Sequence, residues 1–171
     1  MFGGDISHFT QVGDYLPIIT AALMTDMVFL ANATSFSSKQ LLRWYHLFGL
    51  SAVLADTLIL VIGVILTRFF YYRVFKSFSL IKFCALAVVI QIVHDLVFAL
   101  FFQMVPRNTN KMLDVFKDYA NEKKFGILLA DAAMVLSTCI VAALLVNFKL
   151  NTNIILLIVT IYVVPYFLHK Y

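Results

Sequence analysis

Five apolar stretches, each long enough to cross a lipid bilayer, leave this chain few ways to fold. They cover about residues 15–33, 46–70, 79–105, 125–147 and 152–168. A transmembrane helix needs about 20 largely apolar residues. Backbone N–H and C=O groups find no water in hydrocarbon, so such stretches must be helical. The pattern predicts an all-α integral membrane helical bundle with about five transmembrane helices.

The composition excludes a water-soluble fold. Hydrophobic residues make up 63% of the 171 residues and charged residues only 13%, whereas soluble domains are about 45–50% apolar. The length leaves room for one bundle, so we expect a single transmembrane domain over residues 1–171. Residues 1–14 contain no Lys or Arg, unlike a signal peptide, and no internal repeat is evident. Pro165 is expected to bend or end the fifth helix.

The connector between the third and fourth stretches predicts a further helix over about residues 110–122. Asn110 is a suitable N-cap, and one face of the helix collects Met112, Leu113, Phe116 and Tyr119 or Ala120. The other face is charged and carries Lys111, Asp114, Lys117, Asp118 and Glu122. This pattern is typical of an amphipathic interfacial helix on the membrane surface. Docking of a soluble partner on the same helix is the alternative.

Basic residues favour one orientation of the bundle. Eight lie on the side of the interfacial helix, namely Lys39, Arg43, Arg107, Lys111, Lys117, Lys123, Lys124 and Lys170. Five lie on the other side, namely Arg68, Arg73, Lys76, Lys82 and Lys149. The positive-inside rule predicts that the side with eight is cytoplasmic. Trp44 and Tyr45 on that side are interpreted as part of an interfacial aromatic belt.

Four of the apolar stretches each contain one aspartate: Asp26, Asp56, Asp95 and Asp131. An ionisable group at the centre of a transmembrane helix costs at least about 2.5–3.5 kcal/mol on insertion scales. From the helical rise, two of these residues lie roughly 10 Å, and two roughly 15 Å, from the side of the interfacial helix. Together with His94, they are predicted to form one intramembrane polar layer if the helices turn these faces inward.

Three interpretations of this layer are open. The acids could be protonated or hydrogen-bonded to nearby polar residues, for which the candidates are Thr25, Thr57, Gln91, Ser137 and Thr138. They could form an ion or proton pathway. They could also receive a cationic group from another chain. Arg68 and Lys82 lie near the opposite membrane face and are therefore poor partners.

Catalytic, metal and cofactor sites find little support in the sequence. Neither Gly-x-Ser-x-Gly nor His-Glu-x-x-His is present, so we expect no enzyme. Cys84 and Cys139 are interpreted as small buried hydrophobes without a disulfide or metal. His46 and His94 differ in depth by well over ~10 Å, which does not suit axial ligation of one haem. No basic run is long enough for a nucleic-acid patch, so neither a cofactor nor nucleic acid is expected.

Two blocks of sequence carry a resemblance: QIVHDLVFALFFQMVPRNTNKMLDVFKDYANEKKFGILLADAAM and the earlier ADTLILVIGVILTRFF. Their motif-like pieces are His94-Asp95, Pro106 with Asn110, the Asp114–Tyr119 segment, Gly126 and Asp131. Over roughly residues 45–145, the chain resembles small multi-pass membrane proteins of large nucleocytoplasmic DNA viruses, the chlorella viruses in particular. The resemblance implies residence in the lipid membrane beneath an icosahedral capsid, and it assigns no catalytic residue.

Two expectations about function follow. The first is a non-enzymatic structural protein of a viral internal membrane, present in the virion. Its interfacial helix and basic loops would contact viral capsid proteins or neighbouring copies in a homo-oligomer. The alternative is a small ion or proton transporter or channel that uses the four intramembrane aspartates. A membrane enzyme acting on lipid or quinone is a weaker third possibility.

Overall fold

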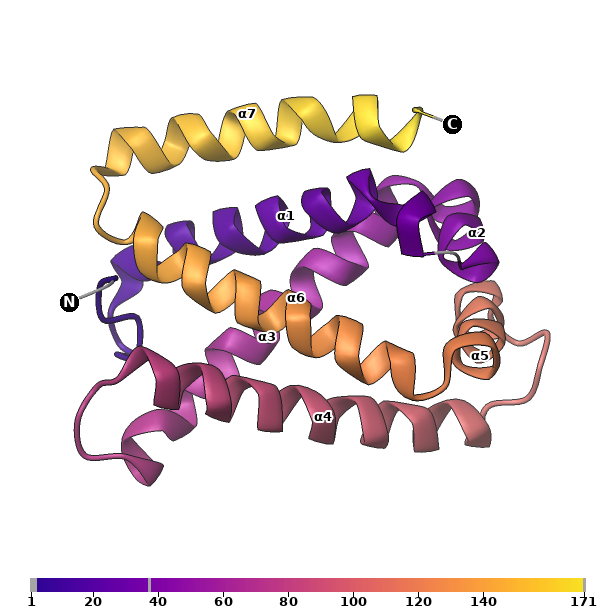
Figure 1. Ribbon diagram of the computed structural model, residues 1–171, viewed down its shortest axis with the longest axis horizontal. Helices are drawn as coiled ribbons and strands as arrows, with labels where there is room; N and C mark the ends of the chain where they lie inside the picture. Colours follow the sequence, from indigo (N-terminus) through magenta and orange to yellow (C-terminus); the bar gives the residue numbers. More distant parts are fainter. Residues whose placement is uncertain (1–2, 37, 171) are drawn as a thin grey trace.

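The computed structural model describes residues 3–36 and 38–170, and this part of the chain consists of an irregular segment over residues 3–11 followed by helices joined by turns (Figure 1). Five helices are long and apolar enough to cross a membrane. They are α1 (Tyr15–Ala31), α3 (Leu50–Val74), α4 (Leu80–Met104), α6 (Phe125–Leu145) and α7 (Leu150–Leu168). The shorter helices are η1 (Val12–Asp14), η2 (Ala33–Phe36), α2 (Lys39–Phe48) and α5 (Lys111–Lys123). The predicted all-α fold class is confirmed.

Four of the long helices form the core of the bundle. Helices α1 and α4 each pack against both α3 and α6, and α7 packs against α1 from outside. The N-terminal segment and the α3–α4 and α6–α7 turns lie at one end of the molecule, which we call the N-terminal end (Figure 1). Helices α2 and α5 and the end of α7 lie at the other, the cap end. Short turns between antiparallel neighbours are typical of helical bundles.

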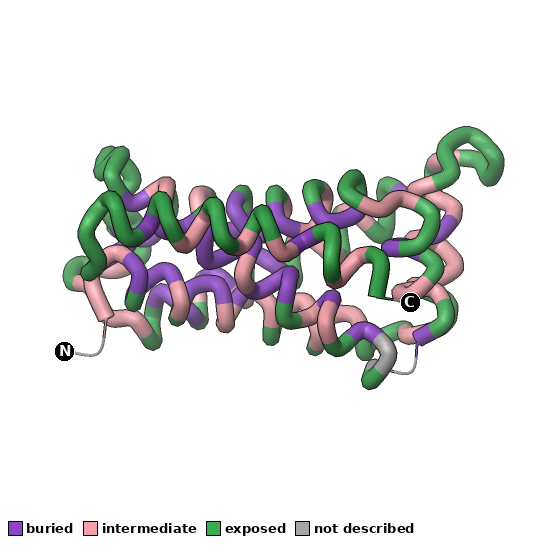
Figure 2. The backbone as a smooth tube through the Cα atoms, turned by 90° about the horizontal axis from the view of Figure 1, so that it is seen from above, coloured by how far each residue is buried: buried purple, intermediate pink, exposed green. Residues whose placement is uncertain are grey.

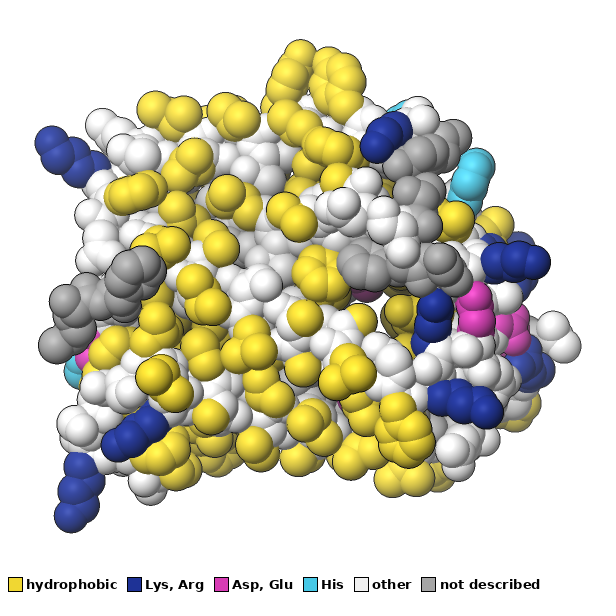
Figure 3. All heavy atoms as spheres, viewed as in Figure 1, with side chains coloured by type: hydrophobic (Ala, Val, Ile, Leu, Met, Phe, Trp, Pro, Cys, Tyr) yellow, Lys and Arg dark blue, Asp and Glu magenta, His cyan; other side chains and the backbone are white. Residues whose placement is uncertain are grey.

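Small residues bring the core helices together, and large apolar residues cover the outside. Ala21 and Ala22 of α1 and Ala142 of α6 are fully buried, which allows the close approach seen in membrane bundles. The outward faces are apolar: Leu100 is 62% exposed and Ile158 is 61% exposed. Buried backbone lies in the interior (Figure 2), and the basic side chains gather at the two ends (Figure 3). This distribution is compatible with an integral multi-pass membrane protein.

The predicted second span, residues 46–70, is wrong at its start. The chain turns at Gly49, which has φ 50° and ψ −123°, and the spanning helix begins only at Leu50. The preceding residues form α2, whose first turn is capped by Ser38 Oγ accepting from Leu41 N at 3.1 Å. Apolar residues continue across the turn, so hydropathy does not reveal it. Glycine adopts a positive φ without the cost that a Cβ imposes.

Other boundaries differ from the predicted ones by a few residues. Helix α5 is capped as predicted, because Asn110 Oδ1 accepts from Met112 N at 2.8 Å and from Leu113 N at 3.2 Å. Its position along a membrane surface stays a prediction. Helix α7 begins at Leu150 and passes through Pro165 to Leu168, so this proline does not end the helix at once.

The chain contains an internal repeat that the sequence did not reveal. Helices α1–α2–α3 and α4–α5–α6 follow the same course: a spanning helix, an amphipathic helix at the cap end, a sharp turn and a second spanning helix. The two turns have nearly the same backbone conformation. Gly49 has φ 50° and ψ −123°, and Lys124 has φ 47° and ψ −122°. Helix α7 follows the second repeat and has no counterpart after α3.

Sequence and packing support the same correspondence. Asp56 lies seven residues after Gly49, and Asp131 lies seven residues after Lys124; each ends a Leu-Ala-Asp triplet. Helices α1 and α4 share an Asp-x-Val-Phe segment at Asp26 and Asp95. The α1–α3 contact corresponds to α4–α6, and α1–α6 corresponds to α3–α4. The core therefore has an approximate two-fold axis along the bundle, as in membrane proteins with parallel repeats.

Candidate functional site

The four intramembrane aspartates lie toward the cap end, one on each helix of the four-helix core. Asp26 is five residues before the end of α1, and Asp95 is nine residues before the end of α4. Asp56 and Asp131 lie in the second turns of α3 and α6. At 1.5 Å per residue, all four lie within roughly 14 Å of a helix end facing the cap. We call these four residues the acidic layer.

In the first repeat, α2 donates hydrogen bonds to the acidic layer. Trp44 Nε1 donates to Asp56 Oδ2 at 3.0 Å, and the Tyr45 hydroxyl donates to Asp26 Oδ1 at 3.2 Å. Thr57 Oγ1 donates to Asp26 Oδ2 at 3.5 Å. Asp26 is fully buried, and these contacts replace the water that its carboxyl group loses. Asp26 is thus joined to both other helices of its own repeat.

The second repeat is less completely hydrogen-bonded. Gln91 Nε2 donates to Asp95 Oδ1 at 2.8 Å, and His94 Nδ1 lies 3.2 Å from the same oxygen. Among the described residues, the buried Asp95 Oδ2 has no hydrogen-bond partner. Ala120 stands in α5 at the position that corresponds to Tyr45 in α2. The second repeat therefore has no counterpart of the Tyr45 phenol.

The carboxyl groups lie close enough for their charges to interact. Asp26 interacts with Asp56, and Asp131 interacts with both Asp95 and Asp56. Within the described ranges, His94 is the one basic side chain that contacts a carboxyl group of the layer. Four negative charges this close repel strongly in a low-dielectric medium. The layer therefore brings four carboxyl groups together where water screens their repulsion only weakly.

Two phenols face this layer from the cap helices. Burial raises the pKa of Tyr45 well above its usual value, and the charges of Asp56 and Asp26 raise it further. Burial also raises the pKa of Tyr119 to about 12, and the nearby Asp131 adds to this effect. Both phenols stay protonated at physiological pH, so both keep a hydroxyl that can donate a hydrogen bond; the Tyr45 hydroxyl donates to Asp26.

Helices α2 and α5 are fastened to each other by two carboxylates. Asp118 accepts from Arg43 Nη1 at 3.1 Å and from Arg107 Nη1 at 2.8 Å. Glu122 accepts from the backbone N–H groups of Lys39 and Gln40, at 3.0 Å each. The Glu122 carboxylate thus lies at the N-terminus of α2, where the helix dipole favours a negative charge.

The helix predicted to be interfacial packs on α2. Of its predicted contact residues, Lys111 is exposed, and the others are half-buried: Met112, Leu113, Phe116, Lys117 and Tyr119. The sequence interpretation left out Val115, which is only 2% exposed. The ring of Phe116 lies 4.5 Å from that of Trp44 in α2. Much of the apolar face of α5 is therefore used inside the molecule.

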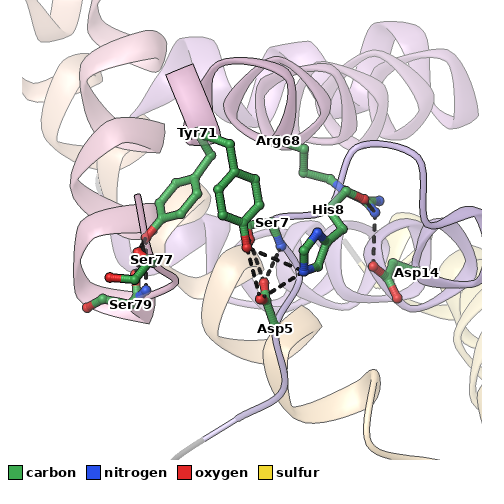
Figure 4. Close-up of polar contacts among 9 residues, drawn as sticks. Asp5, Ser7, His8, Asp14, Arg68, Tyr71, Ser77 and Ser79 are labelled. Carbon is green, nitrogen blue, oxygen red and sulfur yellow. Dashed lines mark hydrogen bonds and ion pairs between the residues drawn. The ribbon is translucent and has the colours of Figure 1, made fainter. Parts of the chain in front are cut away.

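A polar cluster at the N-terminal end was not predicted. Arg68 of α3 has a fully buried side chain and pairs with Asp14 at 2.9 Å. It also donates to the carbonyl oxygens of Gln11, at 3.0 Å, and His8. These contacts tie the N-terminal segment across the end of the bundle (Figure 4). Arg68 is remote from the acidic layer, as expected, and its pairing with Asp14 is not evident from the sequence.

The described residues contain no group of three or more His, Cys, Asp or Glu able to hold a metal ion. His46 lines a cavity at the end of α7, whereas His94 contacts Asp95 in α4. Cys84 of α4 and Cys139 of α6 are both free and buried. Comparison of the chain with protein-family models, curated proteins and solved structures finds no match.

Proposed function

We propose that the protein is a non-enzymatic structural component of a membrane, in which the acidic layer holds the bundle and its cap together. The observation that carries this proposal is that the hydrogen bonds of the layer connect different elements. Trp44 and Tyr45 of α2 reach Asp56 of α3 and Asp26 of α1. Polar side chains that bond across helices stabilise bundles in hydrocarbon, where water is not available as an alternative partner.

The surface supports the same proposal. The sides of the bundle are apolar, whereas the cap end presents exposed charged side chains such as Lys39 and Lys111. A charged platform on a membrane-embedded bundle suits contact with a protein shell that carries the complementary charge. We place the protein in the internal membrane of a virion, and the resemblance of residues 45–145 to viral membrane proteins supports this location.

Location in virus particles tests the proposal. Quantitative mass spectrometry of purified virions should find the chain at high copy number. Trypsin treatment of particles stripped of their capsid should cut at Lys111 in the cap and leave Arg73 at the N-terminal end protected. Absence of the chain from particles would end the viral proposal, and equal cutting at both ends would contradict an intact spanning topology.

Ion or proton transport is the second candidate, favoured by the position of the acidic layer between two repeats. In transporters built from parallel or inverted repeats, binding sites lie at the repeat interface within the membrane. Asp131 of the second repeat interacts with Asp56 of the first across this interface. Intramembrane acids that face the interior of a bundle commonly mark ion or proton paths.

A flux assay separates the two candidates. Proteoliposomes carrying an internal pH-sensitive dye should show faster proton entry than empty liposomes if the protein is a transporter. Asp56→Asn and Asp131→Asn should then abolish the difference. Asp114→Asn, a matched change in α5 outside the layer, should preserve it. Flux equal to that of empty liposomes would reject transport and leave the structural proposal standing.

A further inference from the structure

Two cavities at the cap end occupy equivalent places in the two repeats. The first, of about 280 Å³, is lined by Leu30, Ala33, Leu42, Tyr45 and His46. The second, of about 330 Å³, is lined by Ala99, Phe102, Lys117, Ala120 and Asn121, together with Arg107. With Asp26 aligned to Asp95 and Gly49 to Lys124, the five residues of the first set match the first five of the second, in order. We call the second cavity the α5 groove.

The two cavities differ in what covers them. Phe167 and Leu168, at the end of α7, also line the first cavity. Helix α7 packs against α1, and the described part of the chain has no helix in the corresponding place beside α4. The face of α4 next to the α5 groove is open: Ala99 is exposed, and Leu96, one turn earlier on the same face, is 54% exposed. The α5 groove therefore lacks the cover that its counterpart receives.

The chemistry of the α5 groove differs from that of its counterpart in charge. Lys117 stands where the first cavity has Leu42, and Arg107 adds a second cation whose side chain is 51% exposed. One donor of Arg107 binds Asp118, and Lys117 donates to the Val105 carbonyl oxygen. A guanidinium has five N–H donors and an ammonium has three, so both groups retain capacity for another acceptor.

The interior of the groove is apolar beneath these cations. Phe102 is only 8% exposed, and its ring stacks on that of Phe116 at 5.4 Å. A cationic rim above an apolar floor, at the end of a spanning helix, matches the two parts of a phospholipid. Basic pockets beside membrane helices bind the head groups of acidic lipids, and the groove volume lies in the range of small-molecule sites.

We propose that the α5 groove binds an acidic phospholipid. Its phosphate lies at Arg107 and Lys117, and an acyl chain follows the exposed face of α4 in the place that α7 occupies on α1. The rival occupant is the α7 helix of a second copy. That helix ends at Leu168 and is followed by His169 and Lys170, so it would bring positive charge to a positive rim. Charge complementarity therefore favours the lipid.

Lipid titration of the detergent-solubilised full chain, followed by native mass spectrometry, tests the proposal. Phosphatidylglycerol should bind more tightly than phosphatidylcholine. The double variant Arg107→Gln/Lys117→Gln should weaken phosphatidylglycerol binding roughly tenfold, since each basic residue near an acidic lipid contributes a moderate share of the attraction. The matched control Lys39→Gln/Lys111→Gln removes two exposed charges at the same end and should leave the affinity unchanged.

Ala99→Trp gives an independent test, because it fills the groove without removing a charge. It should also lower phosphatidylglycerol binding, whether or not the double variant folds. The proposal is overturned if the control variant loses as much affinity as the groove variants, or if both lipids bind equally. It is also overturned if soluble glycerol phosphate competes at the same concentrations, or if native spectra show a lipid-free dimer that Ala99→Trp dissociates.

Discussion

The hydroxyl of Tyr45 lies 3.2 Å from Oδ1 of Asp26 and joins cap helix α2 to core helix α1. Tyr45→Phe removes this donor and keeps the ring in place. A buried acceptor that loses its partner costs about 1–3 kcal/mol, so we expect lower stability by that amount. Thermal unfolding in detergent measures the effect. Tyr162→Phe is the control, because the Tyr162 hydroxyl pairs with Tyr166 on the exposed face of α7; equal losses in both variants would contradict the role of Asp26.

Both sharp turns should favour glycine, so removing it from one and introducing it in the other should have opposite effects on stability. Gly49→Ala should destabilise the protein by about 1–3 kcal/mol, because an L residue is strained at this positive φ. A Cβ at Gly49 meets no atom within 4 Å, so the loss would come from the backbone alone. Lys124→Gly should be neutral or stabilising, since Lys124 already adopts the same conformation. Denaturant unfolding of each variant measures its free energy of unfolding. Destabilisation by Lys124→Gly would refute the equivalence of the turns.

Removing the charge of Arg68 should lower the stability of the fold by a large amount. Arg68→Gln leaves Asp14 buried without its ionic partner, and breaking a buried pair costs about 3–5 kcal/mol. The freed N-terminal segment should then be cut faster by chymotrypsin at Phe9. Arg73→Gln is the control: Arg73 also lies in α3, but its guanidinium lies over the ring of Phe69 at the exposed surface. Unchanged cleavage in Arg68→Gln would show that the pair does not hold this segment.

The contact between α2 and α5 should weaken in acid. Desolvation raises the pKa of Glu122. The hydrogen bonds that its carboxylate accepts from Gln40, Lys39 and Ser38 outweigh this effect, and the pKa of Glu122 lies below its usual value. The hydrogen bond from Arg107 lowers the pKa of Asp118. A carboxylate with a lowered folded-state pKa stabilises the fold above its unfolded pKa, near pH 4, and this contribution is lost as the pH falls through the folded value.

Fluorescence of Trp44, the single tryptophan of the chain, measures this acid response because its ring packs on Phe116 of α5. Both carboxylates are solvent-accessible, so we expect a contribution of at most about 1 kcal/mol. Glu122→Gln should remove part of the change between pH 5 and pH 2, whereas Asp114→Asn should not. An identical titration in the wild type and Glu122→Gln would assign the response to another group, such as Asp56, to which Trp44 donates.

The sequence predicted the spanning helices well because their signal is bulk hydropathy over many residues. It missed the turn at Gly49 because His46–Gly49 is bordered by apolar residues on both sides. It also missed the repeat. Apolar side chains replace one another freely against lipid, so only the short Leu-Ala-Asp and Asp-x-Val-Phe segments coincide. The correspondence became visible in backbone conformation and helix contacts.

The aspartates stood out because an ionisable residue is rare in an apolar stretch. The residues that donate hydrogen bonds to these aspartates did not stand out in the sequence. Trp44 and Tyr45 resemble the aromatic residues of a membrane interface, and only the turn at Gly49 brings them back over Asp56 and Asp26. The Arg68–Asp14 pair was missed because it depends on how residues 3–11, which form no regular helix, cross the end of the bundle.

Each repeat contains two helices long and apolar enough to cross a bilayer, so a repeat that spans the bilayer returns the chain to the side from which it came. Among the described residues, α7 is the one long helix without a counterpart in the other repeat, and in a bilayer its single pass would put the residues that follow it on the opposite side from residues 3–11. Ending the chain before Leu150 would leave both repeats in the same orientation and reverse only the compartment in which a C-terminal reporter is found.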